Sequence, residues 1–85
     1  MAYLYILYSD VTRKYYIGST NDLDRRLSEH NRGQTKSTKA GVPWNLAFVK
    51  VCEYPHARAL EIKLKRKKSR KFIEQMILNQ SITLS

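Results

Sequence analysis

The segment AYLYILYS, residues 2–9, constrains the fold more than any other part of the chain. It is almost wholly apolar and rich in Tyr and Ile, which favour extended backbone. Since neighbouring side chains of a strand point to opposite faces, an apolar run of this kind needs cover on both faces. The sequence therefore begins with a predicted strand that other elements cover on both sides.

The next residues complete a predicted hairpin. They are a polar loop at residues 9–13 and a second strand at residues 14–19, ended by Gly18. A register that pairs Tyr8 with Tyr15 also pairs Tyr5 with Gly18. Tyr5 and Tyr16 then lie diagonally adjacent on one face, whereas a slip of one residue separates them. Gly18 would leave open space beside Tyr5 for a substrate. The alternative is that both tyrosines are ordinary core aromatics.

The rest of the chain predicts one more strand and three helices. Asn21 or Asp22 can cap a helix that runs to about Asn31, before a stop at Gly33. Next come a basic loop at 32–43, a strand at 44–54, a helix at about 56–67 after Pro55, and a last helix from its cap Ser69 to about Leu78, with Phe72, Ile73, Met76 and Ile77 inward.

The order β-β-α-β-α-α predicts a small α/β (α+β) domain in which helices flank a mostly antiparallel three-stranded sheet. Eighty-five residues fit a single domain, residues 1–85. Residues 79–85 are expected to form a frayed tail.

Charge is the most informative part of the composition. Sixteen Lys and Arg face seven Asp and Glu, which gives a net charge of +9. This charge attracts polyanions, nucleic acid first and an anionic membrane surface second, although a merely basic protein stays an alternative. No apolar run approaches the ~20 residues of a membrane span, and no secretion signal starts the chain. With a single cysteine, Cys52, a cytoplasmic protein without membrane partners is expected.

Arg26 and His30 stand four residues apart and therefore share one face of the predicted helix. Leu23 and Leu27 turn about 100° away, toward the core, which leaves Arg26 and His30 at the rim between core and solvent. A guanidinium at such a rim suits a phosphate, because its donors match two oxygens. Two solvated side chains are the alternative.

Glu61 falls within the apolar stripe of its predicted helix. At 100° per residue from Ala57, Leu60 lies at about 300°, Leu64 at about 340° and Glu61 at about 40°. A buried carboxylate is costly unless it is paired or bound to a metal. It is either a structural partner of Arg26 or a lysine, or an oxygen ligand for Mg²⁺. Both interpretations stay open at this point.

A dense basic run follows Glu61, with seven cations among the nine residues from 63 to 71. Its members are Lys63, Lys65, Arg66, Lys67, Lys68, Arg70 and Lys71. A cluster of one sign is typical of a surface that follows phosphates, although many charge runs are only solvated faces. Lys36 and Lys39 in the preceding loop would extend it.

Five elements in order resemble the GIY-YIG nuclease family, over residues 3 to 61. They are Tyr3-Leu4-Tyr5, Tyr16-Ile17-Gly18, Arg26, His30 and Glu61. Residues 29–48 and the lysine-rich helix resemble the compact stand-alone members. Two positions differ from the family pattern: Tyr3 replaces the glycine of the first motif, and Asn79 is the only candidate for the asparagine that follows the glutamate in many members.

The resemblance implies a divalent-metal-dependent endonuclease that hydrolyses phosphodiester bonds in DNA, in repair or recombination. Tyr5 would help to activate the attacking water, and Tyr16 would position that water or the scissile phosphate. Arg26 would stabilise the developing charge, and His30 would contact the phosphate or assist proton transfer. Glu61 would hold one Mg²⁺ or Mn²⁺, bound weakly without substrate, and Gly18 would allow close approach of the substrate.

Two other classes remain. One is a module on the same fold that binds nucleic acid and cuts it poorly or not at all. The other is a basic ribosome- or membrane-associated protein. The resemblance favours DNA over RNA as the partner.

Overall fold

The computed structural model describes the backbone of residues 1–84 and the side chains of residues 1–79. The elements are β1 Ala2–Ser9, β2 Tyr15–Thr20, α1 Leu23–Asn31, the short 3₁₀ helix η1 Lys36–Gly41, β3 Trp44–Cys52, α2 Tyr54–Lys67 and α3 Arg70–Leu84. The three strands form one antiparallel sheet in the order β2-β1-β3. The predicted α+β fold and element order are therefore confirmed.

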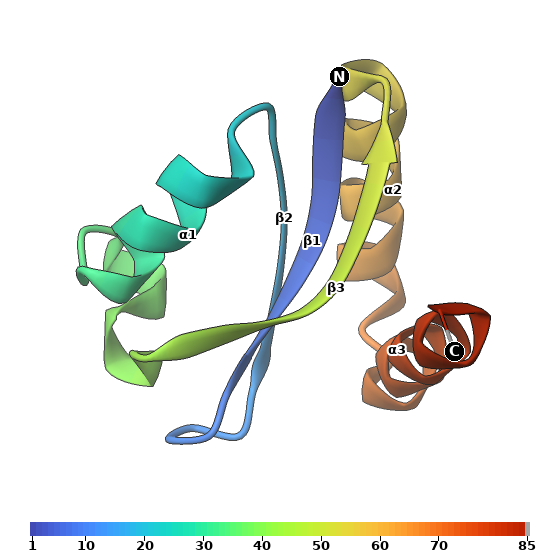
Figure 1. Ribbon diagram of the computed structural model, residues 1–85. Helices are drawn as coiled ribbons and strands as arrows, with labels where there is room; N and C mark the ends of the chain where they lie inside the picture. Colours follow the sequence, from blue (N-terminus) through green and yellow to red (C-terminus); the bar gives the residue numbers. More distant parts are fainter. Residues whose placement is uncertain (85) are drawn as a thin grey trace.

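The sheet separates two groups of helices (Figure 1). On one side, α1 packs over a cluster built from Tyr5, Leu7 and Trp44, with Tyr16, Leu23, Leu27 and Val42 around it. On the other, α2 and α3 cover Leu4, Ile6, Ile17 and Phe48, together with Leu64 and Ile73. Strand β1 lies in the middle and its side chains supply both clusters, which explains why residues 2–9 are almost wholly apolar.

The hairpin has the predicted register. Tyr8 pairs with Tyr15, Leu7 with Tyr16, and Tyr5 with Gly18. Tyr5 and Tyr16 consequently lie on the same face of the sheet, the one that faces α1.

A bulge interrupts the pairing of β1 with β3. Ile6 pairs with Phe48 and Leu7 pairs with Leu46, so that Ala47 is an extra residue on β3. Without the bulge, Trp44 and Phe48 would share a face, because they are four residues apart. With it, Phe48 joins the α2–α3 side and Trp44 joins the α1 side.

Local signals set most helix ends. Asp22 accepts a hydrogen bond from the backbone N–H of Arg25 at 3.1 Å, and Ser69 accepts one from that of Phe72 at 3.2 Å, so both predicted caps are confirmed. Lys68 ends α2 in a left-handed conformation, with φ 49°. Gly33, also left-handed at φ 73°, donates its N–H to the carbonyl of His30.

Four details differ from the sequence-based expectation. The loop at 32–43 contains η1, and α3 continues to Leu84 instead of ending near Leu78. Strand β3 ends at Cys52, because α2 already begins at Tyr54. The side chain of Phe72 is exposed at 38%, with the ammonium of Lys67 4.0 Å from its ring centroid. The expected fraying of residues 79–85 stays a prediction, and Ser85 lies outside the described residues.

Over residues 1–84, no helix combines the length and the apolar character that crossing a lipid bilayer requires.

Candidate active site

Tyr5 and His30 form the centre of the α1 side of the molecule. The hydroxyl of Tyr5 lies 3.1 Å from Nε2 of His30, although 25 residues separate them in the sequence. Both residues are buried, with Tyr5 1% exposed and His30 fully covered. The ring of Tyr16 contacts the His30 imidazole edge to face, with 4.9 Å between centroids. Two tyrosines and one histidine that the sequence singled out are thus brought together.

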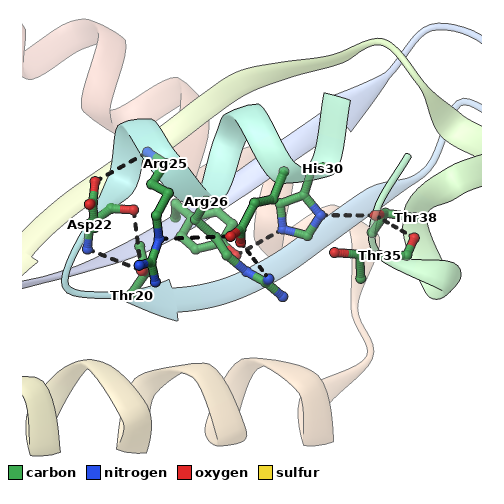
Figure 2. A network of polar contacts seen from close by, with 9 residues as sticks. Thr20, Asp22, Arg25, Arg26, His30, Thr35 and Thr38 are labelled. Atoms are coloured by element: carbon green, nitrogen blue, oxygen red, sulfur yellow. Dashed lines mark hydrogen bonds and ion pairs between the residues drawn. The ribbon is translucent and has the colours of Figure 1, made fainter. Parts of the chain in front are cut away.

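A second contact fixes the other nitrogen of His30. Its Nδ1 lies 2.9 Å from the hydroxyl oxygen of Thr38, and that hydroxyl donates to the carbonyl of Thr35 at 3.3 Å (Figure 2). The indole N–H of Trp44 donates to the carbonyl of Thr38 at 2.7 Å. Sequence reasoning missed Thr38, because residues 32–43 carried no pattern that predicted regular structure.

The start of β3 is fastened to the end of α1. The side-chain amide of Asn31 donates to the carbonyl of Trp44 at 3.2 Å, and its oxygen accepts from the N–H of Trp44. Gly41 is required here, because a Cβ at this position would collide with the Trp44 ring. These contacts place η1, and Thr38 with it, against His30.

Burial sets the protonation of this pair. Burial raises the pKa of Tyr5, and the neighbouring Arg26 guanidinium offsets only part of the increase. Burial and the charge of Arg26 lower the pKa of His30, against an opposing effect of Glu29. Near pH 7 both groups are therefore neutral, and the phenol still carries the proton that it shares with His30.

Arg26 lies at the rim, as the helix spacing predicts. Its guanidinium contacts Glu29 at 3.1 Å and lies close enough to Tyr5 to influence the pKa of its phenol, while its side chain stays 34% exposed. Figure 2 shows Arg26 beside His30 on α1. The exposed N–H groups of the Arg26 guanidinium are available to an anion that approaches Tyr5.

Glu61 is buried on α2, with 5% of its surface exposed, as the helix angle predicts. Its Oε1 accepts from the Ser19 hydroxyl and lies 3.2 Å from the Arg58 guanidinium, while its Oε2 lies 2.7 Å from Nζ of Lys65. Burial raises the pKa of Glu61, but the donors Lys65 and Ser19 and the charges of Lys65 and Arg58 outweigh it. The pKa is therefore lowered, and the carboxylate is ionised.

The sequence offered Arg26 or a lysine as a protein partner of Glu61. The structure shows a lysine, Lys65, in this position, whereas Arg26 pairs with Glu29. Ser19 and Arg58 had not been predicted as partners. The lysine could have been found from the sequence, because Glu61 and Lys65 are four residues apart on one helix.

Glu61 lies on one face of the edge strand β2, and the side chains of Tyr5 and Tyr16 lie on the other. Ser19, which holds Glu61, immediately follows Gly18, which pairs with Tyr5. The ammonium of Lys65 reaches around this edge and stands 5.6 Å from the centroid of the Tyr16 ring. The charge of Glu61 also contributes to the raised pKa of Tyr5. The two halves of the candidate site therefore face each other across one edge strand.

A divalent ion fits the chemistry of Glu61. Among the described residues, no three or more His, Cys, Asp or Glu side chains gather in a cluster, so the protein offers this carboxylate without a full set of ligands. Oxygen Oε2 is held by Lys65, whose side chain is 48% exposed and can move aside. Mg²⁺ commonly takes one or two carboxylates and completes its shell with water and substrate phosphate.

Gly18 plays a different part from the one expected. The predicted open space beside it is filled by the ring of Tyr5, and a Cβ on Gly18 would collide with the Tyr5 hydroxyl and Cζ. The expectation of open space for a substrate at Gly18 is therefore wrong. The absence of a side chain instead allows the Tyr5 phenol to lie across β2.

The basic run is divided over the end of α2 and the start of α3. All seven cations are exposed. Lys65 points to Glu61, and Arg70 donates to the carbonyl of Arg13 at 2.6 Å. Lys63 and Lys67 line an apolar groove of about 260 Å³ on the α2–α3 side, away from the tyrosines. Lys36 and Lys39 are exposed on η1.

A smaller cavity of about 170 Å³ adjoins Tyr16. It is lined by Thr12, Lys14, Tyr15, Tyr16, Ser37, Ala40, Gly41 and Trp44. Aromatic, hydroxyl and cationic groups therefore continue from the tyrosine pair toward the hairpin loop.

Similar proteins place this geometry in a family. Residues 1–74 match the model of the GIY-YIG catalytic domain. A "UPF0213 protein" of Streptococcus pneumoniae serotype 4 (strain ATCC BAA-334 / TIGR4) is 38% identical, over 98% of this chain and 85% of the relative. "UPF0213 protein spr1390" of S. pneumoniae (strain ATCC BAA-255 / R6) is 36% identical over the same shares.

A solved structure has the same fold. The solution NMR structure of the UPF0213 protein BH0048 from Bacillus halodurans superposes with a TM-score of 0.55 at 31% identity, over 91% of this chain and 83% of that chain. The family match covers the strands, α1, η1 and α2, and therefore every residue that was carried over from the resemblance except Asn79. The chain belongs to the GIY-YIG family, and its relatives are small UPF0213 proteins.

Proposed function

We propose that this chain is a divalent-metal-dependent endonuclease that hydrolyses phosphodiester bonds in DNA. The observation that carries the proposal is the buried hydrogen bond of 3.1 Å between Tyr5 and His30, with the Arg26 guanidinium beside it. A base, a cation for the developing charge and a carboxylate for a metal ion are what phosphodiester hydrolysis requires. Family membership supports a nucleic-acid substrate, and the resemblance favours DNA over RNA.

The neutral Tyr5 cannot act as a base by itself, because its raised pKa keeps the phenol protonated. In the proposed step, the attacking water gives a proton to the Tyr5 oxygen while the Tyr5 proton passes to Nε2 of His30. The water oxygen forms a bond to phosphorus, and the bond to the leaving oxygen breaks with its electron pair going to that oxygen, which takes a proton from the solvent. Since His30 is fully buried, proton transfer suits it better than contact with the phosphate.

Arg26 binds the non-bridging oxygens, and Tyr16 positions the water or the phosphate. Glu61 would hold one Mg²⁺ or Mn²⁺, which supplies positive charge to the phosphate when it is bound. The basic run and Lys36 and Lys39 bind the neighbouring phosphates. We place this activity in the cytoplasm, in DNA repair or recombination.

A binding module without cleavage is the second candidate, and one observation favours it. The carboxylate of Glu61 already has Ser19, Arg58 and Lys65 as partners, so its negative charge is balanced without a metal ion. In this candidate Lys65 keeps its position and the site only binds phosphate.

Cleavage of labelled DNA and RNA, as duplex, single-stranded, nicked and branched molecules, tests the proposal in Mg²⁺, in Mn²⁺ and in EDTA. The matched control is Glu61→Gln, purified in the same way. We expect cleavage of DNA that EDTA abolishes and that falls about 10²- to 10³-fold in Glu61→Gln. Tight binding of DNA with no cleavage under any condition would favour the binding module, and cleavage equal in both proteins would indicate a contaminant.

A further inference from the structure

Three hydrogen bonds in series connect Tyr5 to the backbone of η1. They run from the Tyr5 hydroxyl to His30 at 3.1 Å, from His30 to Thr38 at 2.9 Å, and from Thr38 to the carbonyl of Thr35 at 3.3 Å. Thr38 is buried at 1% exposure, and His30 is fully covered. Water therefore does not compete for these groups, and their hydrogens must be distributed among the partners that are present.

The last hydrogen bond, from Thr38 to the Thr35 carbonyl, indicates which group is the donor in each of the three hydrogen bonds. A backbone carbonyl accepts only, so in the 3.3 Å contact between Thr38 and Thr35 the hydroxyl is the donor. Oxygen Oγ1 of Thr38 then has only lone pairs to offer to Nδ1 of His30. With the hydroxyl donating to Thr35, Nδ1 carries the proton of the neutral imidazole, and Nε2 is left as an acceptor that faces the Tyr5 hydroxyl.

We propose that Thr38 is a positioning residue of the site. Its hydroxyl holds His30 in the tautomer with the proton on Nδ1, and so keeps Nε2 free to take the proton of Tyr5. This inference rests on the proposed nuclease function. In the opposite tautomer Nε2 carries the proton and is a donor. The Tyr5 hydroxyl then has no acceptor in the imidazole ring for its own proton.

The surroundings hold Thr38 in place. The Trp44 indole donates to its carbonyl at 2.7 Å, and its N–H donates to the carbonyl of Thr35 at 3.1 Å. The charged and titratable groups around the imidazole are Tyr5 on β1, Tyr16 on β2, and Arg26 and Glu29 on α1. Among the residues whose side chains the structure describes, none of these groups hydrogen-bonds Nδ1, so Thr38 is the group that decides the tautomer.

Ring nitrogen shifts of His30 test the proposal directly. Long-range ¹H–¹⁵N correlation spectra of the full chain at neutral pH should show a protonated Nδ1 and a bare Nε2. Thr38→Val, which keeps the shape and removes the hydroxyl, should move His30 to a tautomer mixture or to Nε2–H. Thr38→Ser should restore the wild-type pattern, and Ser37→Ala, on the exposed neighbouring residue, should leave it unchanged.

Cleavage gives the second measurement. Thr38→Val should lower kcat about 10- to 100-fold with little change in KM, and Thr38→Ser should recover most of it. A wild-type His30 with its proton on Nε2 would overturn the proposal, and this measurement needs no variant to fold. An unchanged tautomer in Thr38→Val would also overturn it, even with a lower Tm, because Thr38 would then be only structural.

The two proposals fail in different ways. A chain that cleaves nothing but shows Nδ1–H in the wild type and a shifted tautomer in Thr38→Val contradicts the nuclease function and keeps the role of Thr38. A chain that cleaves DNA but shows Nε2–H keeps the nuclease function and contradicts the role of Thr38.

Discussion

The ammonium of Lys65 lies 2.7 Å from Oε2 of Glu61, and the same nitrogen stands 5.6 Å from the centroid of the Tyr16 ring. Lys65 therefore occupies the space next to the carboxylate that a divalent ion would need. A bound phosphate offers Lys65 another anion, and its departure frees Oε2. Binding of DNA and binding of metal should then favour each other, because coupling between two sites is reciprocal.

Lys65→Met should increase the affinity of the free protein for Mn²⁺ about two- to fivefold, since an ion pair whose lysine is 48% exposed contributes up to about 1 kcal/mol. The measurement is Mn²⁺ binding by electron paramagnetic resonance, with and without a non-cleavable DNA. Lys67→Met is the matched control. Lys67 is on the same helix as Lys65, α2, but its ammonium lies over the ring of Phe72 on α3 and not beside Glu61. An affinity equal to that of the wild type would show that Lys65 does not compete for Glu61.

Tyr5→Phe should abolish most cleavage and leave the fold intact. The ring still fills the space over Gly18, while His30 loses the proton donor on Nε2. We expect cleavage about 10²- to 10⁴-fold slower and a stability loss of about 1 kcal/mol. Tyr8→Phe, on the same strand, is the control. Circular dichroism melts measure the stability loss, and cleavage assays measure the rate. Full activity in Tyr5→Phe would remove Tyr5 from the mechanism.

Gly18→Ala should displace the Tyr5 ring from His30, because the new methyl group meets the Tyr5 hydroxyl and Cζ. Overpacking of this kind costs about 1–3 kcal/mol. A double-mutant cycle of thermal melts with Tyr5→Leu checks the cause, since the smaller side chain makes room for the methyl group. Additive losses in the double variant would place the strain of Gly18→Ala elsewhere.

Stability should fall as the pH drops below 6.5, the ordinary pKa of histidine in the unfolded chain. The folded pKa of His30 is lowered, so the unfolded chain binds the proton first and acid favours unfolding. The contribution of His30 is complete above pH 6.5 and is lost progressively down to the folded pKa. Glu61, whose pKa is also lowered, acts in a separate window below pH 4.5.

Melts of the wild type and of His30→Gln between pH 7.5 and pH 4.5 would separate these contributions. Since this range lies above the Glu61 window, the variant should show a flatter dependence of Tm on pH. Equal slopes in the two proteins would show that His30 does not titrate differently on folding.

DNA binding should weaken steeply with salt, with a slope of about −0.9 in log K against log salt for each phosphate contact on duplex DNA. Neutralising Lys65, Arg66 and Lys68 to Gln should flatten the slope, because these cations are exposed at the C-terminal end of α2. The comparison protein carries Lys36→Gln and Lys39→Gln on η1. If only the η1 variant changed the slope, the principal DNA-binding surface would lie on the α1 side.

The sequence by itself determined the local relationships. Period-two alternation around Gly18 determined the hairpin register, and with it the shared face of Tyr5 and Tyr16. Helical spacing determined that Arg26 lies at the rim and that Glu61 is buried. Each of these properties depends on the geometry of a single element or a single turn, which a short stretch of residues specifies.

Only the tertiary structure decided which groups meet across elements. The bulge at Ala47 turns Trp44 to the α1 side, where its indole fixes Thr38 against His30. A bulge depends on how two strands pair, so alternation along β3 alone predicts the wrong face for Trp44 or Phe48. In the same way, the space beside Gly18 is filled by a side chain from a neighbouring strand. Such contacts join residues that are far apart in the sequence, and packing of the whole chain selects them.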